Sequence, residues 1–410
     1  MNVMHPISLN SHAVNFKALP PLSLYIHIPW CVKKCPYCDF NSHEVKPVLS
    51  FSKEGEGGIP DALEEQYVAA LMRDLEMALP QIWGRKVYTV FFGGGTPSLL
   101  SGDAVAEIMR QTRMLLPLSN DAEITLEANP GTVEATRFAA FGDAGVNRLS
   151  MGIQSFNDEH LKALGRIHSG DDARNAIDVA MRHFDNINLD LMYALPGQSL
   201  DEALHDVRTA LSFSPQHLSC YHLTLEPNTL FHRNPPALPD DDASADMQQK
   251  IEALLAENGY QHYETSAFAK DKRRSRHNLN YWKFGDYLGL GAGAHSKLSF
   301  PDRVIRQMRY KQPKAYMEQV MQGTPVQLEN EVSLAELPFE FMMNALRLNE
   351  GFDSALFSER TSLSLFSIQR ELLEAERRGL LVRDIARIAP TLLGRRFLND
   401  LLEIFLADKH

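Results

Sequence analysis

Three of the four cysteines lie within one short run, Cys31-Val-Lys-Lys-Cys35-Pro-Tyr-Cys38, whereas Cys220 stands alone. Such clustering is unlike a disulfide framework and points to metal binding. Three thiolates on one loop can hold three irons of a [4Fe–4S] cluster, which leaves the fourth iron for an exogenous chelate. The amine and carboxylate of S-adenosylmethionine can supply that chelate. Lys33 and Lys34 add positive potential that favours the thiolates.

A zinc site is the alternative interpretation of these cysteines. His27, His43 or Cys220 could complete it, because zinc accepts Cys₃His and Cys₄ ligand sets. Zinc knuckles commonly repeat a two-residue gap, whereas here a three-residue gap precedes a two-residue gap, with Tyr37 just before the last cysteine. This spacing resembles the motif of the radical-SAM superfamily, in which the cluster cleaves S-adenosylmethionine to a 5′-deoxyadenosyl radical. The resemblance favours the cluster over zinc.

A glycine-rich turn and several polar residues are candidates for holding the cofactor. The turn, Phe91-Phe92-Gly93-Gly94-Gly95-Thr96-Pro97, would let the backbone approach a ligand closely, although a plain structural turn has the same appearance. Glu127, Gln154 and Asp190 stand at or near the ends of later strand-like runs, and Arg166 follows one of them. Polar side chains are poor core material at such positions, so ligand contact is favoured.

Apolar strand-like runs alternate with helical patterns through the first part of the chain. The strand candidates are Leu24–Ile28, Val87–Phe92, Ile124–Leu126, Arg148–Ile153, Ile187–Met192 and Leu218–Leu225, and the first helices lie near Ala62–Leu79 and Ala104–Leu116. Parallel strands need right-handed helical crossovers, so the alternation predicts an α/β fold with a partial (β/α)6-type TIM barrel. The cysteine run follows the first strand and should lie at the barrel's C-terminal mouth.

Three regions are expected along the chain. Residues 1–20 form an N-terminal extension, 21–300 the barrel, and 301–410 a smaller, mainly helical domain. Phe51–Pro60, which is rich in glycine and charge, predicts an exposed flexible loop. Leu372–Val382 resembles the helix and wing of a winged-helix module, with a helical lid packed on the barrel as the alternative.

Charge and hydropathy restrict the partners. The formal net charge is −11, from 52 acidic and 41 basic side chains, with no basic block that could follow a phosphate backbone, which argues against nucleic acid. No apolar run approaches the roughly 18 residues that span a bilayer, so no integral membrane segment is expected. The start of the sequence lacks the pattern of a signal peptide, and we therefore expect a cytoplasmic protein.

Residues 21 to 300 resemble the oxygen-independent coproporphyrinogen dehydrogenase family. The motifs are Tyr25-Ile-His-Ile-Pro-Trp-Cys31, the cysteine run, Gly-Gly-Gly-Thr-Pro, Glu127-Ala-Asn-Pro130, Gly152-Ile-Gln-Ser155 and Leu191-Met-Tyr-Ala-Leu-Pro-Gly197. By matching position, the family implies that Tyr25, Gly94 and Glu127 contact cluster-bound S-adenosylmethionine. Tyr37, Gly95, Thr96, Gln154, Arg166 and Asp190 match positions that line the adjoining site, several of which surround a second nucleotide in the decarboxylase.

Two features depart from the enzymes that decarboxylate coproporphyrinogen. Those enzymes carry a fourth cysteine one residue after the third, whereas this chain has Phe40 there. Their long segment before the first strand is also mostly missing, because the first strand begins near residue 23. Both departures count against radical decarboxylation, which remains the alternative function, so the resemblance implies a radical-SAM relative without this enzymatic activity.

A second motif, Arg276-His277-Asn278-Leu-Asn-Tyr281-Trp282, points to haem. On a helix, four-residue spacing pairs His277 with Tyr281 and Asn278 with Trp282, and imidazole and phenolate are both axial ligands of haem iron. A histidine satisfied beside core aromatic residues is the alternative. His295, within a glycine-rich segment that could be a tight turn, is a competing ligand.

The second motif is similar to the His-Asn-x-x-Tyr-Trp signature of the HemW family of haem chaperones, dehydrogenase-like proteins that bind and deliver haem. This resemblance implies that His277, Asn278, Tyr281 and Trp282 belong to a haem site. The expected cofactors are therefore a [4Fe–4S] cluster, S-adenosylmethionine and haem. The expected partners are haem and a haem-acceptor protein, with an electron donor as a further candidate.

Overall fold

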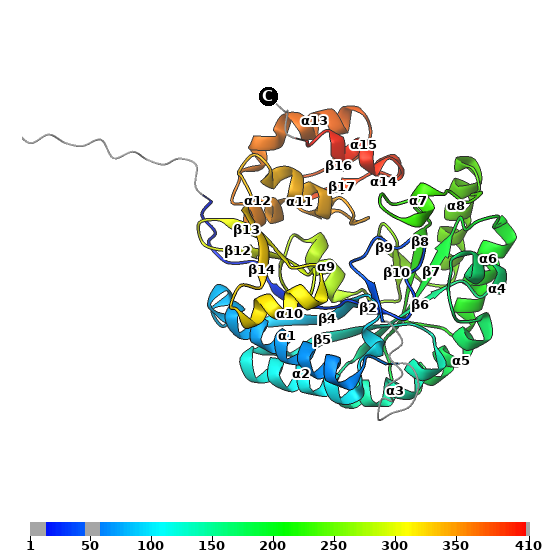
Figure 1. Cartoon of the computed structure of the whole chain (residues 1–410). Coiled ribbons are helices and arrows are strands. Elements are labelled where there is room, and N and C mark those ends of the chain that lie inside the picture. Colours follow the sequence, from blue (N-terminus) through cyan, green and yellow to red (C-terminus); the bar gives the residue numbers. More distant parts are fainter. Residues whose placement is uncertain (1–13, 46–57, 407–410) are drawn as a thin grey trace, which may run out of the picture.

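A computed structural model describes residues 14–45 and 58–406, and its large unit is built on a 12-stranded sheet. Six strands are parallel neighbours in chain order: β1 (Leu22–Ile28), β4 (Val87–Gly94), β5 (Leu118–Ala128), β6 (Arg148–Gln154), β7 (Ile187–Tyr193) and β8 (His217–His222). The sheet curves, and its crossover helices cover the outer face (Figure 1). The predicted partial barrel is confirmed.

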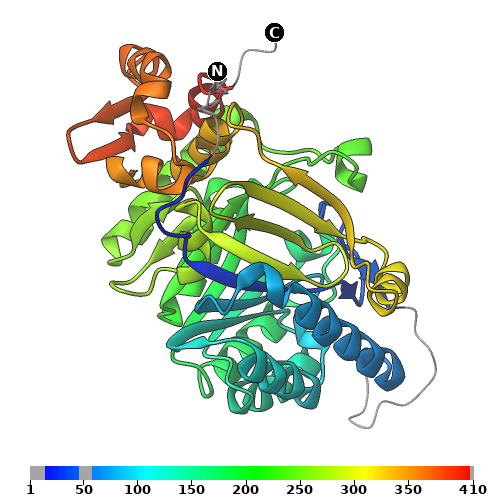
Figure 2. The same cartoon turned by 90° about the vertical axis from the view of Figure 1, so that its left-hand side faces the viewer.

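The barrel does not close. Beside β1 the sheet continues through β11 (Asp286–Leu290), which is parallel to β1, and then through the antiparallel strands β12 (His295–Ser299), β13 (Val304–Arg309) and β14 (Val326–Glu331). Beside β8 it continues through β10 (Ala267–Ala269) and β9 (Gln261–Glu264). The sheet therefore has two edges, β14 and β9, and the later strands form a separate wall when the molecule is turned (Figure 2).

The helices that follow the parallel strands are α1 (Asp61–Ile82), α2 (Gly102–Leu115), α3 (Thr132–Asp143), α4 (Asp158–Ala163), α5 (Gly170–Ala180), α6 (Leu200–Ser212) and α8 (Asp241–Glu257), with the short η1 (Pro97–Leu99) and α7 (Leu230–Arg233) between them. Several of these helices begin at a side-chain cap, whereas α1 and α3 have none. Ser169 and Ser199 form capping boxes with Asp172 and Glu202, which satisfies the first amides of α5 and α6. These caps fix where each of these two helices starts above the strand that precedes it.

Helix α9 (Arg276–Trp282) fills the open side of the barrel. It packs against β1, β4 and β11, and on its other side against α11 (Leu337–Ala345). The segment is helical, so the four-residue pairing of His277 with Tyr281 and of Asn278 with Trp282, which the sequence analysis considered for a helix, applies. Its position places the second sequence motif at the wall of the barrel.

The second unit has winged-helix topology, as the Leu372–Val382 pattern predicted. After α11 come β15 (Phe352–Asp353), α12 (Ser354–Thr361), η2 (Leu365–Ile368), α13 (Gln369–Arg377) and the hairpin of β16 (Leu381–Arg383) and β17 (Arg387–Pro390), followed by α14 (Leu392–Arg396) and α15 (Leu398–Glu403). The three strands form one antiparallel sheet in the order β15-β17-β16. This unit lies at one end of the molecule, in orange and red (Figure 1).

The boundary expected at residue 300 lies inside the large sheet. β13 and β14, on either side of α10 (Pro313–Met321), extend the sheet to Glu331, so the winged-helix unit begins after that residue. The pattern of β14 is almost entirely polar and exposed, which explains why the sequence did not indicate a strand there.

Three further expectations concern the N-terminal extension, the loop Phe51–Pro60 and membrane-spanning segments. Of the predicted N-terminal extension, Val14 and Phe16 are buried in the core of the winged-helix unit. Most of the predicted loop Phe51–Pro60 lies outside the described residues. Among the residues that are described, no helix is long and apolar enough to cross a membrane.

Candidate functional site

The cysteine run forms a loop that is tied at its base. β2 (Trp30–Cys31) and β3 (His43–Glu44) pair in parallel, with His43 N donating to Pro29 O at 2.7 Å. The Glu44 carboxylate accepts a hydrogen bond from Lys34 N at 3.0 Å, and Cys38 N donates to Cys35 O at 3.2 Å. These bonds hold the loop over the carboxyl ends of the parallel strands.

All three cysteines of the loop line one cavity of about 420 Å³, which we call the cysteine cavity. It also contains most of the residues expected to hold the cofactor: Tyr37, Gly94, Gly95, Thr96, Glu127, Gln154, Arg166 and Asp190. Cys220 is buried on β8 and does not line it. The structure thus brings the glycine turn and the polar strand ends together beneath the cysteine loop.

A hydrogen-bonded chain runs beneath two of the thiols. Thr96 Oγ1 lies 3.5 Å from Cys31 Sγ and accepts a bond from Asn129 Nδ2 at 3.0 Å. Arg166 donates to Asn129 Oδ1 at 2.7 Å and lies 3.6 Å from Cys35 Sγ. Sequence reasoning missed Asn129, although it stands inside the Glu127-Ala-Asn-Pro130 motif.

The surroundings of the thiols combine burial with a nearby cation. Burial raises the pKa of Cys31 and Cys38, with a hydrogen bond from Thr96 opposing the rise at Cys31, so iron or another cation would have to stabilise the thiolates. Arg166 places its guanidinium beside them, and its buried Nε has no hydrogen-bond partner among the described residues. Within residues 14–45 and 58–406, no three His, Cys, Asp or Glu side chains converge as a single-ion site requires.

Two carboxyl groups face each other inside the barrel. Glu127 accepts a bond from Gly94 N at 3.3 Å, and Asp190 accepts from Asn188 Nδ2 at 2.8 Å and from Ser150 Oγ at 3.1 Å. Burial, reinforced by the charge of Asp190, raises the pKa of Glu127 to about 8. Burial raises the pKa of Asp190 as well. The pair therefore retains a proton near neutrality and can accept a cationic amine by releasing it.

Backbone strain marks the end of β6. Gln154 has a φ of +67°, and the register between β6 and β7 shifts at this point. A Cβ at Gly152 would lie 3.0 Å from Gln154 Nε2, so glycine leaves room for this amide beside the cavity. Positive φ at a residue other than glycine costs about 1–3 kcal/mol and clusters at functional sites.

A second cavity of about 550 Å³ lies on the other side of the cysteine loop, and we call it the tyrosine cavity. Tyr281, Tyr287 and His295 line it, and it shares Gly94 and Glu127 with the cysteine cavity. Tyr25, which the family resemblance assigned to S-adenosylmethionine, lines the tyrosine cavity rather than the cysteine cavity. Its hydroxyl is hydrogen bonded to His27 Nδ1 at 3.0 Å.

The four expected haem residues on α9 separate into two groups. Tyr281 lines the tyrosine cavity, whereas His277, Asn278 and Trp282 line neither of the two cavities. His277 is 3% exposed, and its Nδ1 is hydrogen bonded to Thr89 Oγ1 at 2.8 Å. The indole of Trp282 lies under the guanidinium of Arg347 at 4.4 Å. His277 and Trp282 therefore make contacts within the protein and do not line either cavity.

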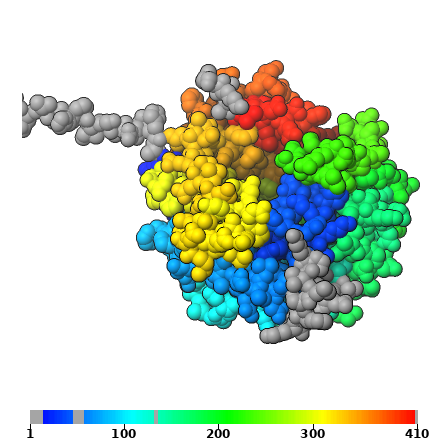
Figure 3. Space-filling model, viewed as in Figure 1, coloured from blue at the N-terminus to red at the C-terminus, as the bar shows by residue number. Residues whose placement is uncertain are grey.

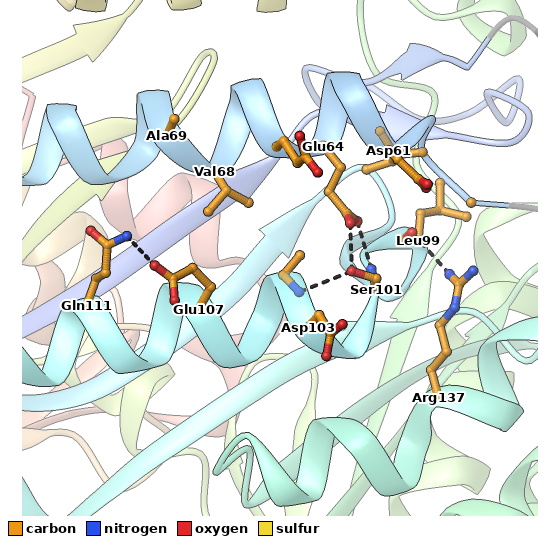
Figure 4. A pocket seen from close by; sticks show the side chains of 14 residues that line it. Asp61, Glu64, Val68, Ala69, Leu99, Ser101, Asp103, Glu107, Gln111 and Arg137 are labelled. Carbon is orange, nitrogen blue, oxygen red and sulfur yellow. Dashed lines mark hydrogen bonds between the residues drawn. The ribbon is translucent and has the colours of Figure 1, made fainter. Parts of the chain in front are cut away.

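A further groove of about 400 Å³ lies outside the barrel, between α1 and α2. Its polar groups largely bond one another: Glu64 accepts from Ser101 N and Oγ at 2.7 and 2.6 Å, and Gln111 donates to Glu107 at 2.6 Å (Figure 4). The groove contains none of the expected site residues. The surface on the side shown in Figure 3 instead has the cysteine-loop region, in dark blue, between the green and yellow segments.

Comparisons with known proteins agree with this geometry. The family model for the radical SAM superfamily matches residues 25–210, and that for the HemN C-terminal domain matches residues 332–397. The solved coproporphyrinogen III oxidase HemN of Escherichia coli has the same fold, with a TM-score of 0.77, 24% identity, and coverage of 94% of this chain and 90% of that one. Fold and cysteine loop together define a radical-SAM core with a HemN-type C-terminal unit.

The nearer relatives identify the branch. The heme chaperone HemW of Escherichia coli is 50% identical over 95% of this chain and 99% of its own length. That of Haemophilus influenzae is 46% identical over 95% of this chain and 99% of its own length. The chain belongs to the HemW family.

Proposed function

We propose that this protein is a haem chaperone, which binds haem and passes it to an acceptor protein in the cytoplasm. The relatives named heme chaperone, matched over nearly their whole length, carry this proposal. Phe40 supports it, because the family resemblance implies a fourth cysteine at this position in the enzymes that decarboxylate coproporphyrinogen. The likeness to HemN, at 24% identity, is a likeness of fold and does not favour the decarboxylation.

The cysteine cavity fits a [4Fe–4S] cluster with S-adenosylmethionine. Cys31, Cys35 and Cys38 would supply three thiolates, and a cubane has four irons, so one iron is left for the amine and carboxylate of the cofactor. The carboxyl of Glu127 would accept the amine. When bound, the cluster supplies an electron, for which an electron-donor protein is the expected source.

The fit extends to the rest of the cavity. Gly94 and Gly95 present backbone without side chains, and Arg166 places a cation beside the cluster position. Thr96, Gln154, Asp190 and Tyr37 contribute polar groups around the same space. The chain's own residues thus bind and orient; none of them is assigned a catalytic role.

One preparation can separate the chaperone from the enzyme. The purified chain, with its cluster reconstituted anaerobically, is given haem in one tube and coproporphyrinogen III with S-adenosylmethionine and a reductant in another. In the first tube we expect a Soret band that saturates at about one haem per chain. In the second we expect no protoporphyrinogen IX. Release of carbon dioxide with formation of protoporphyrinogen IX would reverse the proposal, whatever the haem titration gave.

A further inference from the structure

The tyrosine cavity contains three histidines, and they differ in whether their ring nitrogens are free. Both nitrogens of His27 are engaged, with Tyr25 Oη at 3.0 Å and with Asn41 O at 2.9 Å. His43 Nε2 is bonded to Lys311 O at 3.3 Å. His295 is partly exposed, and its ring has no hydrogen-bond partner within the described residues. Among the described residues, His43 therefore keeps one ring nitrogen without a hydrogen bond and His295 keeps both, so His295 is the histidine of this cavity whose ring is least held by the protein.

The glycine-rich segment before His295 is a tight turn that docks on the cysteine loop. Gly293 has a φ of +80°, and an added Cβ would meet Asn41 Nδ2 at 2.3 Å. The Asn41 amide donates to Ala292 O at 2.9 Å and to Lys311 O at 2.8 Å. These bonds fix the start of β12, and with it His295, against the loop that carries the cysteines.

Flat aromatic rings face the same space. The rings of Tyr281 and Tyr287 stack with centroids 4.3 Å apart and an interplanar angle of 29°. Phe40 also lines the cavity and is 61% exposed, so its ring is accessible to a ligand. Aromatic faces of this kind suit a planar apolar macrocycle.

The cavity offers two ammonium groups to a ligand with carboxylates, and the carboxyl groups of Asp39 and Glu127 line it as well. Lys34 and Lys311 are exposed and line it, and Lys34 Nζ donates to Phe40 O at 3.1 Å, which holds the ammonium beside that ring. Burial and the nearby charges of Lys311 and Arg306 lower the pKa of His295, so the imidazole is neutral near pH 7, as a metal ligand must be. A neutral donor, flat walls and two ammonium groups match an iron porphyrin with two propionates.

His277, by contrast, is inaccessible. Besides its bond to Thr89, its ring stacks on Phe91 at 4.7 Å and lies against Tyr281 at 5.1 Å. Its backbone amide donates to Glu123 at 3.0 Å. A buried ring held in this way can orient Tyr281 without touching the ligand. His277 is thus a positioning residue.

We infer that haem binds in the tyrosine cavity with His295 as its axial ligand, and that the His-Asn-x-x-Tyr-Trp helix supplies the Tyr281 wall rather than the iron ligand. The inference rests on the proposed haem-chaperone function and deepens it. Because the cavity shares Gly94 and Glu127 with the cysteine cavity, haem and S-adenosylmethionine would lie on opposite sides of one wall.

The test is a haem titration of the full chain with its cluster in place, followed by its Soret spectrum. We expect His295→Ala to shift the Soret maximum and to weaken haem binding roughly tenfold or more, and added imidazole to restore the wild-type maximum. His277→Gln should keep that maximum. Lys311→Gln should weaken haem binding without shifting the Soret maximum. His205→Ala, which removes an exposed histidine on α6, is the matched control and should change neither.

The outcomes separate the two proposals. If the wild-type chain binds no haem, the chaperone function is wrong. If it binds haem, but His277→Gln or His43→Ala loses the wild-type maximum while His295→Ala keeps it, the assignment of His295 as the iron ligand is wrong and the function stands. Iron and sulfide content and far-UV circular dichroism, measured on every variant, show that a lost maximum does not reflect a lost fold or cluster.

Discussion

Phe40 stands where the family resemblance implies a fourth cysteine in the decarboxylating enzymes. It lines both cavities and exposes most of its ring, between the cysteines and the stacked tyrosines. A cysteine there would offer a further soft ligand beside the cluster, whereas phenylalanine offers an apolar face. One position thus changes what the loop can present to a second ligand.

The three cysteines of the loop should each be required for the iron–sulfur cluster. Anaerobic reconstitution should give about four irons and four sulfides per chain, because three thiolates on one loop suit a cubane with one open iron. Changing Cys31, Cys35 or Cys38 to Ser should abolish the cluster, as measured by iron and sulfide content and by the charge-transfer absorption. Cys220→Ser, on buried β8, is the control and should retain it. Stoichiometric zinc without that absorption would contradict the prediction.

Helix α9 joins the parallel strands to the second unit through α11. It covers the open side of the barrel, and the buried His277 bonds to Thr89 while Asn280 Nδ2 donates to Ser23 Oγ at 2.9 Å. Both partners lie on the parallel strands, so the helix is fixed to the barrel by polar bonds as well as by ring stacking. Its histidine should therefore affect stability.

Burial, with the positive charge of Arg148, lowers the pKa of His277 from 6.5 to about 3. The folded chain thus binds this proton less readily than the unfolded chain. The contribution of the neutral ring to stability is complete above pH 6.5 and is lost as the pH falls toward 3, with a limiting slope of about 1.4 kcal/mol per pH unit.

We therefore expect His277→Gln, which cannot titrate, to lose less free energy of unfolding than the wild type between pH 7 and about pH 5, although it is the less stable protein at pH 7. Urea denaturation at several pH values measures this. His27 and His168, whose pKa values are also lowered, titrate in both proteins, so they cancel in the difference. Parallel stability curves would contradict the expectation.

Elements with local signals were predicted well from the sequence, and those that depend on distant contacts were not. The six strands and the cysteine loop that follows the first of them were predicted from hydrophobic period and residue spacing, and the structure agrees with each. Strand β14 is polar and exposed, and it exists because β13 pairs with it. Tyr25 and Tyr281 share a cavity because β11 pairs with β1, a contact between residues more than 250 positions apart. Local patterns do not contain that information.

At the scale of the whole molecule, the winged-helix unit supports the barrel's open side. Phe341 of α11 packs edge-to-face on Phe284, which follows α9, at 5.8 Å, and on Phe352 and Phe357 within its own unit at 5.0 and 5.3 Å. All four side chains are buried in one cluster. The second unit and the wall of the tyrosine cavity therefore share a core.

Phe341→Ala should consequently affect both the winged-helix unit and the wall of the tyrosine cavity. We expect it to lower the free energy of unfolding by about 3–5 kcal/mol, as large-to-small changes of buried phenylalanine do, and to weaken haem binding by loosening α9. The cluster, on the far side of the barrel strands, should be retained. Denaturant unfolding, haem titration and iron content measure the three effects. Phe366→Ala, at an 82% exposed position of the same unit, is the control; equal haem affinity in both variants would show that the units are independent.

An unclosed sheet has a cost at its margins, since unpaired edge strands can recruit strands of other chains. At one margin, β14 is short and exposed and bears Glu329 and Glu331, so that approaching copies would repel one another. At the other, Asn349 covers β9, with its amide and side chain donating to Tyr263 O and His262 O at 3.1 and 3.0 Å. Negative charge thus protects the β14 edge from pairing with another chain, and the loop of Asn349 covers the β9 edge. The barrel can therefore remain open without nucleating aggregation.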